Sequence, residues 1–199
     1  MDEVVKSGKT YSLILADPPW RYKYWCPSGG KSSRSAESHY NVETVEDIAK
    51  MPVSQIARKD AWLFMWVTGP FVYESEKVMT GWGFKYSTIG FVWYKVDSRG
   101  RDKITMGHTT RPSAEVILEG RRGSPRSRSS KVRQALDEAR LPEVFRSRPK
   151  RHSVKPDWFH ARLVELCGNV DRIELFCRGP PVAGWDAMGY EADGGQGTL

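Results

Sequence analysis

The sequence predicts an α/β fold, with a mixed, mostly parallel sheet that is covered by helices on both faces. The first observation is a set of continuous apolar runs, such as residues 13–16 and 62–67. A run without polar alternation is typical of a strand that is buried on both faces. The second observation is that amphipathic segments with helical spacing alternate with these runs. Such alternation indicates strands that are connected by helices.

Length and composition indicate a single domain over residues 1–199, with the basic segment 121–151 as an insertion. A chain of 199 residues is long enough to bury a substantial core. No stretch approaches the roughly 18 apolar residues of a membrane-spanning helix, and the first residues lack the apolar region of a signal peptide. The three cysteines have no metal-binding spacing. We therefore expect a cytoplasmic protein without a metal site or a membrane partner.

Local signals place the remaining elements along the chain. Thr44, with Asp47 three residues later, resembles a capping box and predicts a short helix that ends before Pro52. Helical spacing of apolar residues predicts further helices over 69–82, 132–139 and 156–167. Further apolar runs predict strands over 86–95, 114–119 and 172–178. The polar segments 21–41 and 97–111 are expected to form long loops.

The positive charge of the chain is concentrated in one segment. The formal net charge is +7, and segment 121–151 holds eleven lysines and arginines against three acidic residues. Because clustered cations attract phosphate groups, we expect this segment to bind the phosphates of nucleic acid beside the active site. The residues expected to do so are Arg126, Arg128, Lys131 and Arg133. The alternative is a solvated, disordered insertion that only improves solubility.

The tetrapeptide Asp17-Pro18-Pro19-Trp20 directly follows the first apolar run. Because proline cannot donate a hydrogen bond to a neighbouring strand, the two prolines are expected to end the strand, and ligands of open α/β sheets bind at such carboxyl ends. The Asp17 carboxylate and the Pro18 carbonyl can accept both hydrogens of a planar exocyclic amine. The ring of Trp20 can stack on the base that carries this amine. The alternative is a strand-ending turn with a capping aspartate and a core tryptophan.

Two cations are expected at the same end of the sheet. Lys155 stands at the predicted start of a helix, where the helix dipole and the free N–H groups also favour an anion. Arg178 follows the last predicted strand. Both side chains can therefore bind the oxygens of a ligand. The alternatives are a solvated lysine and an arginine that pairs with Glu174 or Asp171.

The chain carries a series of short motifs in a fixed order. They are Ala16-Asp17-Pro18-Pro19-Trp20, Ser38-His39-Tyr40, Leu63-Phe64-Met65-Trp66-Val67-Thr68, His152-Ser153-Val154-Lys155-Pro156-Asp157, Ile173-Glu174-Leu175-Phe176-Cys177-Arg178, and Gly184-Trp185-Asp186 followed by Gly189. In this order, the motifs resemble the mRNA N6-adenosine methyltransferase catalytic-subunit family, also called the MT-A70 family, with its short bacterial and phage members. The resemblance runs from about residue 11 to residue 193.

The resemblance implies a Rossmann-like methyltransferase that transfers a methyl group from S-adenosylmethionine to N6 of adenine in nucleic acid. It implies a catalytic role for Asp17, Pro18, Pro19 and Trp20. The residues that it implies for binding S-adenosylmethionine are Asp17, Pro18, Ser153, Lys155, Phe176, Arg178, Gly189, Tyr190 and Glu191. It also implies that Tyr40 and Glu115 border the pocket for the target base. One departure is that Tyr190-Glu191 replaces an Asn-Gln pair of the family.

The short chain resembles the bacterial and phage members, so we expect DNA as the substrate, in the cytoplasm of a bacterium or a phage-infected host. RNA adenosine is an alternative substrate. A second alternative is a non-catalytic, nucleic-acid-binding subunit of a methyltransferase complex, against which the intact tetrapeptide and Lys155 argue. A third is transfer to N4 of cytosine, because that amine has the same geometry. A monomer, a homodimer and a subunit of a complex are all compatible with the sequence.

Overall fold

The structure is a computed structural model of the chain. It describes residues 1–20, 43–95, 101, 109–129, 132, 135–137, 155 and 158–189. The first expected long loop, 21–41, lies outside the described residues, as does most of the second, 97–111. None of the helices in the described ranges has the length and the apolar character that crossing a membrane requires.

The described strands form one mixed sheet with the order β5-β3-β4-β2-β1-β6-β7. The strands are β1 (Tyr11–Ala16), β2 (Ala57–Val67), β3 (Lys85–Tyr94), β4 (Ala114–Arg122), β5 (Ala135–Asp137), β6 (Arg172–Leu175) and β7 (Asp186–Met188). β4 is antiparallel to both of its neighbours, β2 and β3, and the other pairs are parallel. The prediction of a mixed, mostly parallel sheet is therefore confirmed.

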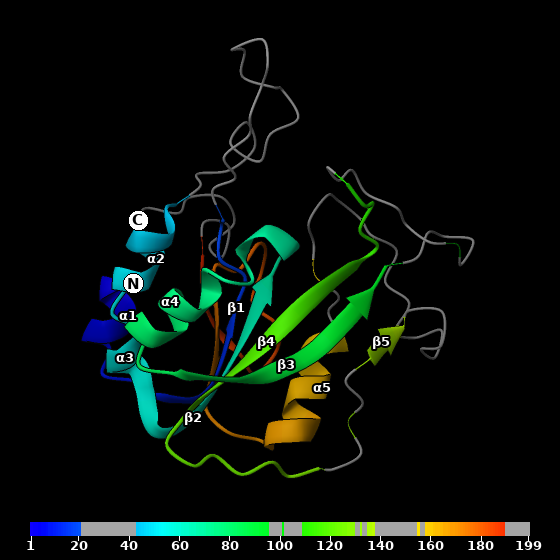
Figure 1. Cartoon of the computed structure of the whole chain (residues 1–199). Helices are drawn as coiled ribbons and strands as arrows, with labels where there is room; N and C mark the ends of the chain where they lie inside the picture. Colours follow the sequence, from blue (N-terminus) through cyan, green and yellow to red (C-terminus); the bar gives the residue numbers. More distant parts are fainter. Residues whose placement is uncertain are drawn as a thin grey trace.

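Helices cover both faces of this sheet (Figure 1). They are α1 (Asp2–Lys6), α2 (Val45–Lys50), α3 (Val53–Ile56), the 3₁₀ helix η2 (Gly69–Phe71), α4 (Ser75–Gly81) and α5 (Trp158–Cys167). Residues of α2, α3 and α4 pack into one apolar core, together with partly buried residues of α1, whereas α5 packs into a second core. The sheet therefore separates two hydrophobic cores, as expected for a three-layer α/β fold.

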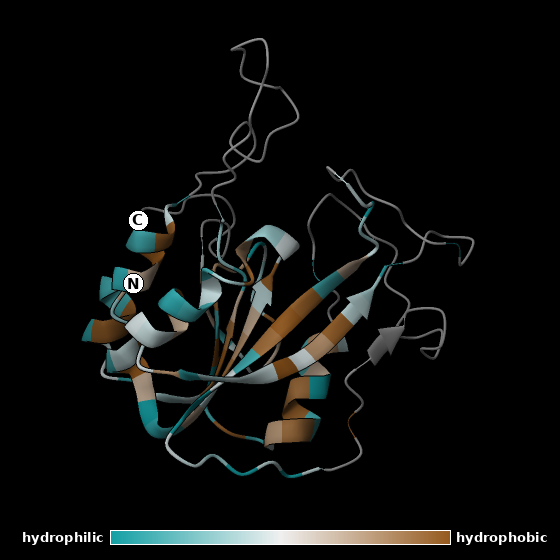
Figure 2. Ribbon diagram, in the orientation of Figure 1, coloured by the Kyte–Doolittle hydropathy of each residue, from teal (hydrophilic) through white to brown (hydrophobic). Residues whose placement is uncertain are grey.

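Strand β2 shows why continuous apolar runs form the centre of the sheet. Leu63 and Met65 belong to the core beneath α2, α3 and α4, whereas Phe64 and Trp66 belong to the core beneath α5. Successive side chains of a strand point to opposite faces, so a strand between two cores needs apolar residues at every position. Figure 2 shows these apolar stretches along the strands, with hydrophilic residues on the outer surfaces of the helices.

Several predicted elements differ from those observed. The capping box at Thr44 is confirmed, because its side chain accepts a hydrogen bond from the Asp47 N–H at the start of α2. The single helix predicted over 69–82 consists of η2 and α4, and the Ser75 hydroxyl donates to the Val72 carbonyl between them. The strand predicted over 172–178 ends at Leu175, because Phe176 has a φ of 63°.

The helix predicted over 132–139 is wrong within the described residues. Strand β5 forms there instead and pairs in parallel with β3, with Ala135 opposite Val92 and Asp137 opposite Tyr94. β3 would otherwise end the sheet and leave its hydrogen-bonding groups without a strand partner. The available ladder positions on β3 therefore override the helical spacing of the sequence.

Asp186, the first residue of β7, connects this outer strand to the beginning of β1. Its Oδ2 atom accepts hydrogen bonds from the Tyr11 hydroxyl at 2.7 Å and from Lys9 Nζ at 3.0 Å. These hydrogen bonds hold the pKa of Asp186 below its ordinary value, although partial burial acts in the opposite direction. The ionised carboxylate is therefore the form that the fold favours.

The substitution Asp186→Asn should lower the free energy of unfolding at pH 7 by about 1 kcal/mol, since the carboxylate is partly exposed to solvent. A depressed pKa in the folded state means that the stabilisation is present above the ordinary pKa of aspartate and is lost as pH falls through the folded-state pKa. Urea unfolding of both proteins at pH 7 and at pH 3 checks this. An equal difference in stability at the two pH values would contradict the role of the ionised group.

Candidate active site

The tetrapeptide Asp17-Pro18-Pro19-Trp20 forms a turn at the carboxyl end of β1, and all of its residues are buried. The Asp17 N–H donates to the Leu175 carbonyl of β6 at 3.3 Å, and the Trp20 N–H donates to the Pro18 carbonyl at 2.8 Å. Beyond the turn, the Pro19 carbonyl accepts a hydrogen bond from the Glu43 N–H at 3.1 Å. The backbone of the turn is thus held at several points, which fixes the direction of the Asp17 side chain.

Trp20 occupies a different place from the predicted one. Its Nε1 donates to the Trp66 carbonyl at 3.2 Å, and its ring stacks on Phe71 of η2 with a centroid distance of 5.2 Å. Only 5% of the residue is exposed. The prediction that this ring stacks on a base is therefore corrected: the ring belongs to the core and anchors the turn to β2 and η2.

The Asp17 carboxylate lies between two cations. Its Oδ1 atom is 3.2 Å from Lys155 Nζ, and its Oδ2 atom is 3.8 Å from a terminal nitrogen of Arg178. The predicted convergence of these three side chains is what the structure shows. The expected alternative partners of Arg178 have other contacts, because Glu174 contacts His160 and Asp171 pairs with Arg58.

Glu115 extends the cluster across the sheet. Its Oε2 atom is 3.2 Å from Lys155 Nζ, and its Oε1 atom pairs with Lys95. Glu115 lies near the start of β4, which runs antiparallel to β2, so it reaches the end of the sheet at which β1 stops. Lys95 follows β3, and its N–H donates to the Ser113 carbonyl just before β4 at 2.7 Å. We call the end of the sheet at which β1 stops the catalytic end, and we call its charged residues Asp17, Lys95, Glu115, Lys155 and Arg178 the catalytic-end cluster.

Burial and neighbouring charges together set the protonation of this cluster. Burial alone would lower the pKa of Lys155, but the carboxylates of Asp17 and Glu115 outweigh burial and raise it. Burial alone would raise the pKa of Glu115, but Lys155 and Lys95 outweigh burial and lower it. At neutral pH, Lys155 is therefore protonated and Glu115 is ionised.

Helix α5 is attached to β6 by a buried polar contact, and Lys155 lies shortly before this helix. Within the first turn of α5, His160 Nε2 lies 2.8 Å from Glu174 Oε2 of β6. The His160 ring also meets the edge of Trp185 at a centroid distance of 4.9 Å. These contacts fix the beginning of α5 against the sheet and thereby help to place Lys155 near Asp17.

Lys95 is the member of the cluster that sequence reasoning missed. Nothing in the sequence marks it beyond its position at the end of a predicted strand, 86–95. The direction of the next strand would have identified Lys95, because an antiparallel β4 brings Glu115 next to Lys95. A sheet assumed to be parallel would have placed Glu115 and Lys95 at different ends.

Phe176 and Gly189, expected near S-adenosylmethionine, shape the backbone beyond β6. The side chain of Phe176 is buried in the core and stacks on Trp82 with a centroid distance of 6.4 Å. It is therefore the backbone of Phe176, and not its ring, that remains for a ligand. A Cβ atom at Gly189 would lie 2.2 Å from the Cys177 carbonyl oxygen, so only glycine permits the close approach of the segments that follow β7 and β6.

The remaining expected site residues divide into two groups. Some lie outside the described residues, namely Tyr40, Lys131, Arg133, Ser153, Tyr190 and Glu191. Arg126 and Arg128 are described, but they lie far from Asp17. They follow the last residue of β4, Arg122, at the end of the sheet where β1 begins, and the Arg128 N–H donates to the Leu166 carbonyl near the end of α5 at 2.6 Å (Figure 1).

The prediction that Arg126 and Arg128 lie beside the active site is therefore wrong. The antiparallel direction of β4 carries the chain away from the catalytic end before the basic segment begins.

As for metals, no group of three or more His, Cys, Asp or Glu in the described ranges could hold an ion.

Comparison with known proteins identifies the family of the chain. The family model MT-A70 matches residues 11–191. The type II methyltransferase M.MunI of a Mycoplasma species is 33% identical over 96% of this chain and 82% of its own length. The human N(6)-adenosine-methyltransferase catalytic subunit METTL3 is 25% identical over 92% of this chain but only 28% of its own length. An Arabidopsis thaliana MT-A70-like N(6)-adenosine-methyltransferase is 26% identical over 93% of this chain and 24% of its own length.

The match to the family model covers the strands, the catalytic-end cluster and the tetrapeptide turn together. The similarity to M.MunI extends over most of both chains. The chain therefore belongs to the MT-A70 family.

Proposed function

We propose that the chain is a site-specific DNA methyltransferase that transfers a methyl group from S-adenosylmethionine to N6 of adenine. The observation that carries this proposal is the buried Asp17 carboxylate, held on a fixed turn between Lys155 and Arg178. Membership of the MT-A70 family supports the adenine amine as the acceptor. The similarity to a type II methyltransferase over most of both chains supports DNA rather than RNA.

The charged cluster has the chemistry that the amino-acid part of S-adenosylmethionine requires. This part carries both a carboxylate and an ammonium group. Lys155 and Arg178 can bind the carboxylate by charge-assisted hydrogen bonds, and Asp17 or Glu115 can bind the ammonium group. The residues present therefore fit the cofactor, which when bound supplies a methyl group that is already activated by its sulfonium.

The turn is suited to orient the adenine amine. The Asp17 carboxylate accepts one N–H of the amine. The Pro18 carbonyl already accepts the Trp20 N–H, and its second lone pair is available for the other N–H. With both hydrogens held, the lone pair of the nitrogen points out of the plane of the base. Such placement can contribute roughly 7–11 kcal/mol to lowering a barrier.

Proton transfer is a late requirement in this reaction. The amine nitrogen becomes acidic only when it carries the new methyl group, so no base needs to act before the methyl transfer. Asp17 then lies close enough to take the proton, because it already accepts that N–H. The target adenine must leave a duplex stack to reach a buried carboxylate, so the enzyme extrudes the base or acts on a single strand.

The substitution Asp17→Asn should reduce methyl transfer by about a hundredfold or more, because an amide neither holds the amine with the same charge nor takes its proton. Incubation with labelled S-adenosylmethionine and DNA or RNA oligonucleotides, followed by mass spectrometry of the nucleosides, measures both activity and product. Asp2→Asn, at an exposed aspartate of α1, is the matched control and should keep full activity. Turnover of Asp17→Asn within about tenfold of wild type would rule out the proposed role.

The substitution Lys155→Ala should weaken the binding of S-adenosylmethionine by about tenfold to a hundredfold, since it removes a charge-assisted hydrogen bond worth roughly 1.5–3 kcal/mol. Calorimetry without nucleic acid measures this affinity directly. Lys77→Ala, which removes an exposed lysine paired with Glu46, controls for the loss of one charge. Unchanged cofactor affinity together with weaker DNA binding would instead place Lys155 on the nucleic-acid path.

A further inference from the structure

A cleft opens at the end of the sheet opposite the catalytic end, where β1 and β6 begin. Its volume is about 850 Å³, and its polar lining includes Lys9, Arg58 and Arg172 together with Asp171 and Asp186. The cleft thus carries three cations and two carboxylates. None of these residues takes part in the catalytic-end cluster, so the proposed reaction leaves the cleft without a role.

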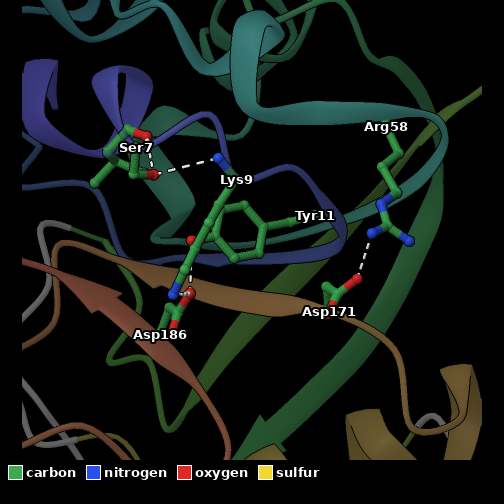
Figure 3. A network of polar contacts seen from close by, with 7 residues as sticks. Ser7, Lys9, Tyr11, Arg58, Asp171 and Asp186 are labelled. Atoms are coloured by element: carbon green, nitrogen blue, oxygen red, sulfur yellow. Dashed lines mark hydrogen bonds and ion pairs between the residues drawn. The ribbon is translucent and has the colours of Figure 1, made fainter.

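Neighbouring groups hold the cations of the cleft in position, and Figure 3 shows this for Lys9 and Arg58. Lys9 Nζ lies 3.0 Å from Asp186, and the guanidinium of Arg58 pairs with Asp171. Arg172 donates to the Asn169 side chain at 2.7 Å and to the Val170 carbonyl at 3.0 Å. Three cationic groups from separate segments therefore converge on one concave surface.

The two ion pairs of the cleft are exposed, so each cation can contact an approaching anion in addition to its carboxylate. The side chains are 63% and 43% exposed in the pair of Lys9 with Asp186, and 47% and 59% exposed in the pair of Arg58 with Asp171. Exposed pairs of this kind contribute only about 0–1 kcal/mol. Guanidinium groups match the geometry of phosphate oxygens, and lysine binds phosphate as a point charge.

An exposed arginine, Arg128, lies next to the segment that lines the cleft. Gly168 directly precedes the residues that line the cleft, and a Cβ atom placed there would lie 2.9 Å from Arg128 Cγ. Arg126 and Arg128 are both exposed. A cation beside the cleft, in addition to those within it, fits an extended polyanion better than a single small anion.

We propose that this cleft binds phosphate groups of nucleic-acid backbone, on a stretch separate from the one that carries the target adenine. The inference extends the proposed function, because that function already makes nucleic acid the substrate. Strand β2 spans 11 residues, or roughly 35 Å at about 3.3 Å per residue. One turn of B-DNA has about this length, so backbone that reaches the cleft lies about ten base pairs or more from the target adenine, or on a second segment.

The double substitution Lys9→Gln and Arg58→Gln tests the proposal through the salt dependence of DNA binding. Each phosphate contact contributes about −0.9 to the slope of log K against log salt concentration for duplex DNA. We expect the slope to become shallower by roughly one unit or more for a duplex of about 40 base pairs. The paired substitution Lys9→Arg and Arg58→Lys keeps both charges and should keep the wild-type slope.

The matched control is Lys50→Gln with Lys77→Gln, which removes two exposed positive charges from α2 and α4. Its slope should equal that of wild type. An unchanged slope in the cleft variant, or an equal change in the control, would overturn the proposal. Circular dichroism spectra of all variants establish that each one folds.

Methyl transfer separates this proposal from the proposed function. At saturating DNA, the cleft variant should keep the wild-type kcat while its KM for DNA rises, because the catalytic end is unchanged. If the wild type methylates nothing, the proposed function fails, and the salt slope still decides the role of the cleft. Titration with inorganic pyrophosphate distinguishes the source of the phosphate. Pyrophosphate binding that the substitution abolishes, with an unchanged DNA slope, would make the cleft a small-anion site and refute the nucleic-acid assignment.

Discussion

The burial of the Asp17 carboxylate is the constraint on which the catalytic end depends. Its side chain is only 11% exposed, and a buried charge without a partner costs several kcal/mol. Lys155 and Arg178 compensate this cost, and they come from distant parts of the sequence. The charged turn is therefore stable only when β1, β6 and the segment before α5 are assembled together.

The reversed direction of β4 decides which residues share the catalytic end. Because β4 is antiparallel to β2, Glu115 lies beside the end of β1, where it binds Lys155. In an all-parallel sheet, Glu115 would lie at the opposite end, and Lys155 would keep one carboxylate partner instead of two. The same reversal carries Arg126 and Arg128 away from Asp17. A single strand direction thus places Glu115 at one end of the sheet and Arg126 and Arg128 toward the other.

Features that depend on a local pattern could be predicted from the sequence, whereas features that depend on long-range neighbours could not. The apolar run before Asp17 and the capping box at Thr44 each need only a few adjacent residues, and both are present. The sequence does not show that the Trp20 ring packs in the core. The ring that it stacks on, Phe71 of η2, follows β2, and only the sheet order brings β2 next to β1. Strand β5 was missed for the same reason, since its partner is the exposed side of β3. Arg178 was expected at the same end of the sheet as Asp17, because the carboxyl ends of parallel strands meet at one end.

The two ends of the sheet differ in what an approaching polyanion would meet. At the catalytic end, Lys155 already serves the carboxylates of Asp17 and Glu115. A phosphate there would compete with the carboxylate of S-adenosylmethionine, which the proposed function assigns to Lys155 and Arg178. At the opposite end, the ion pairs of Lys9 and Arg58 are exposed and weak, so a phosphate can contact these cations without affecting Asp17. Under the proposed function, DNA affinity and methyl transfer therefore depend on different charges. Added salt would then weaken DNA binding while the chemical step at saturating DNA stays nearly constant, because buried pairs are screened far less than exposed ones.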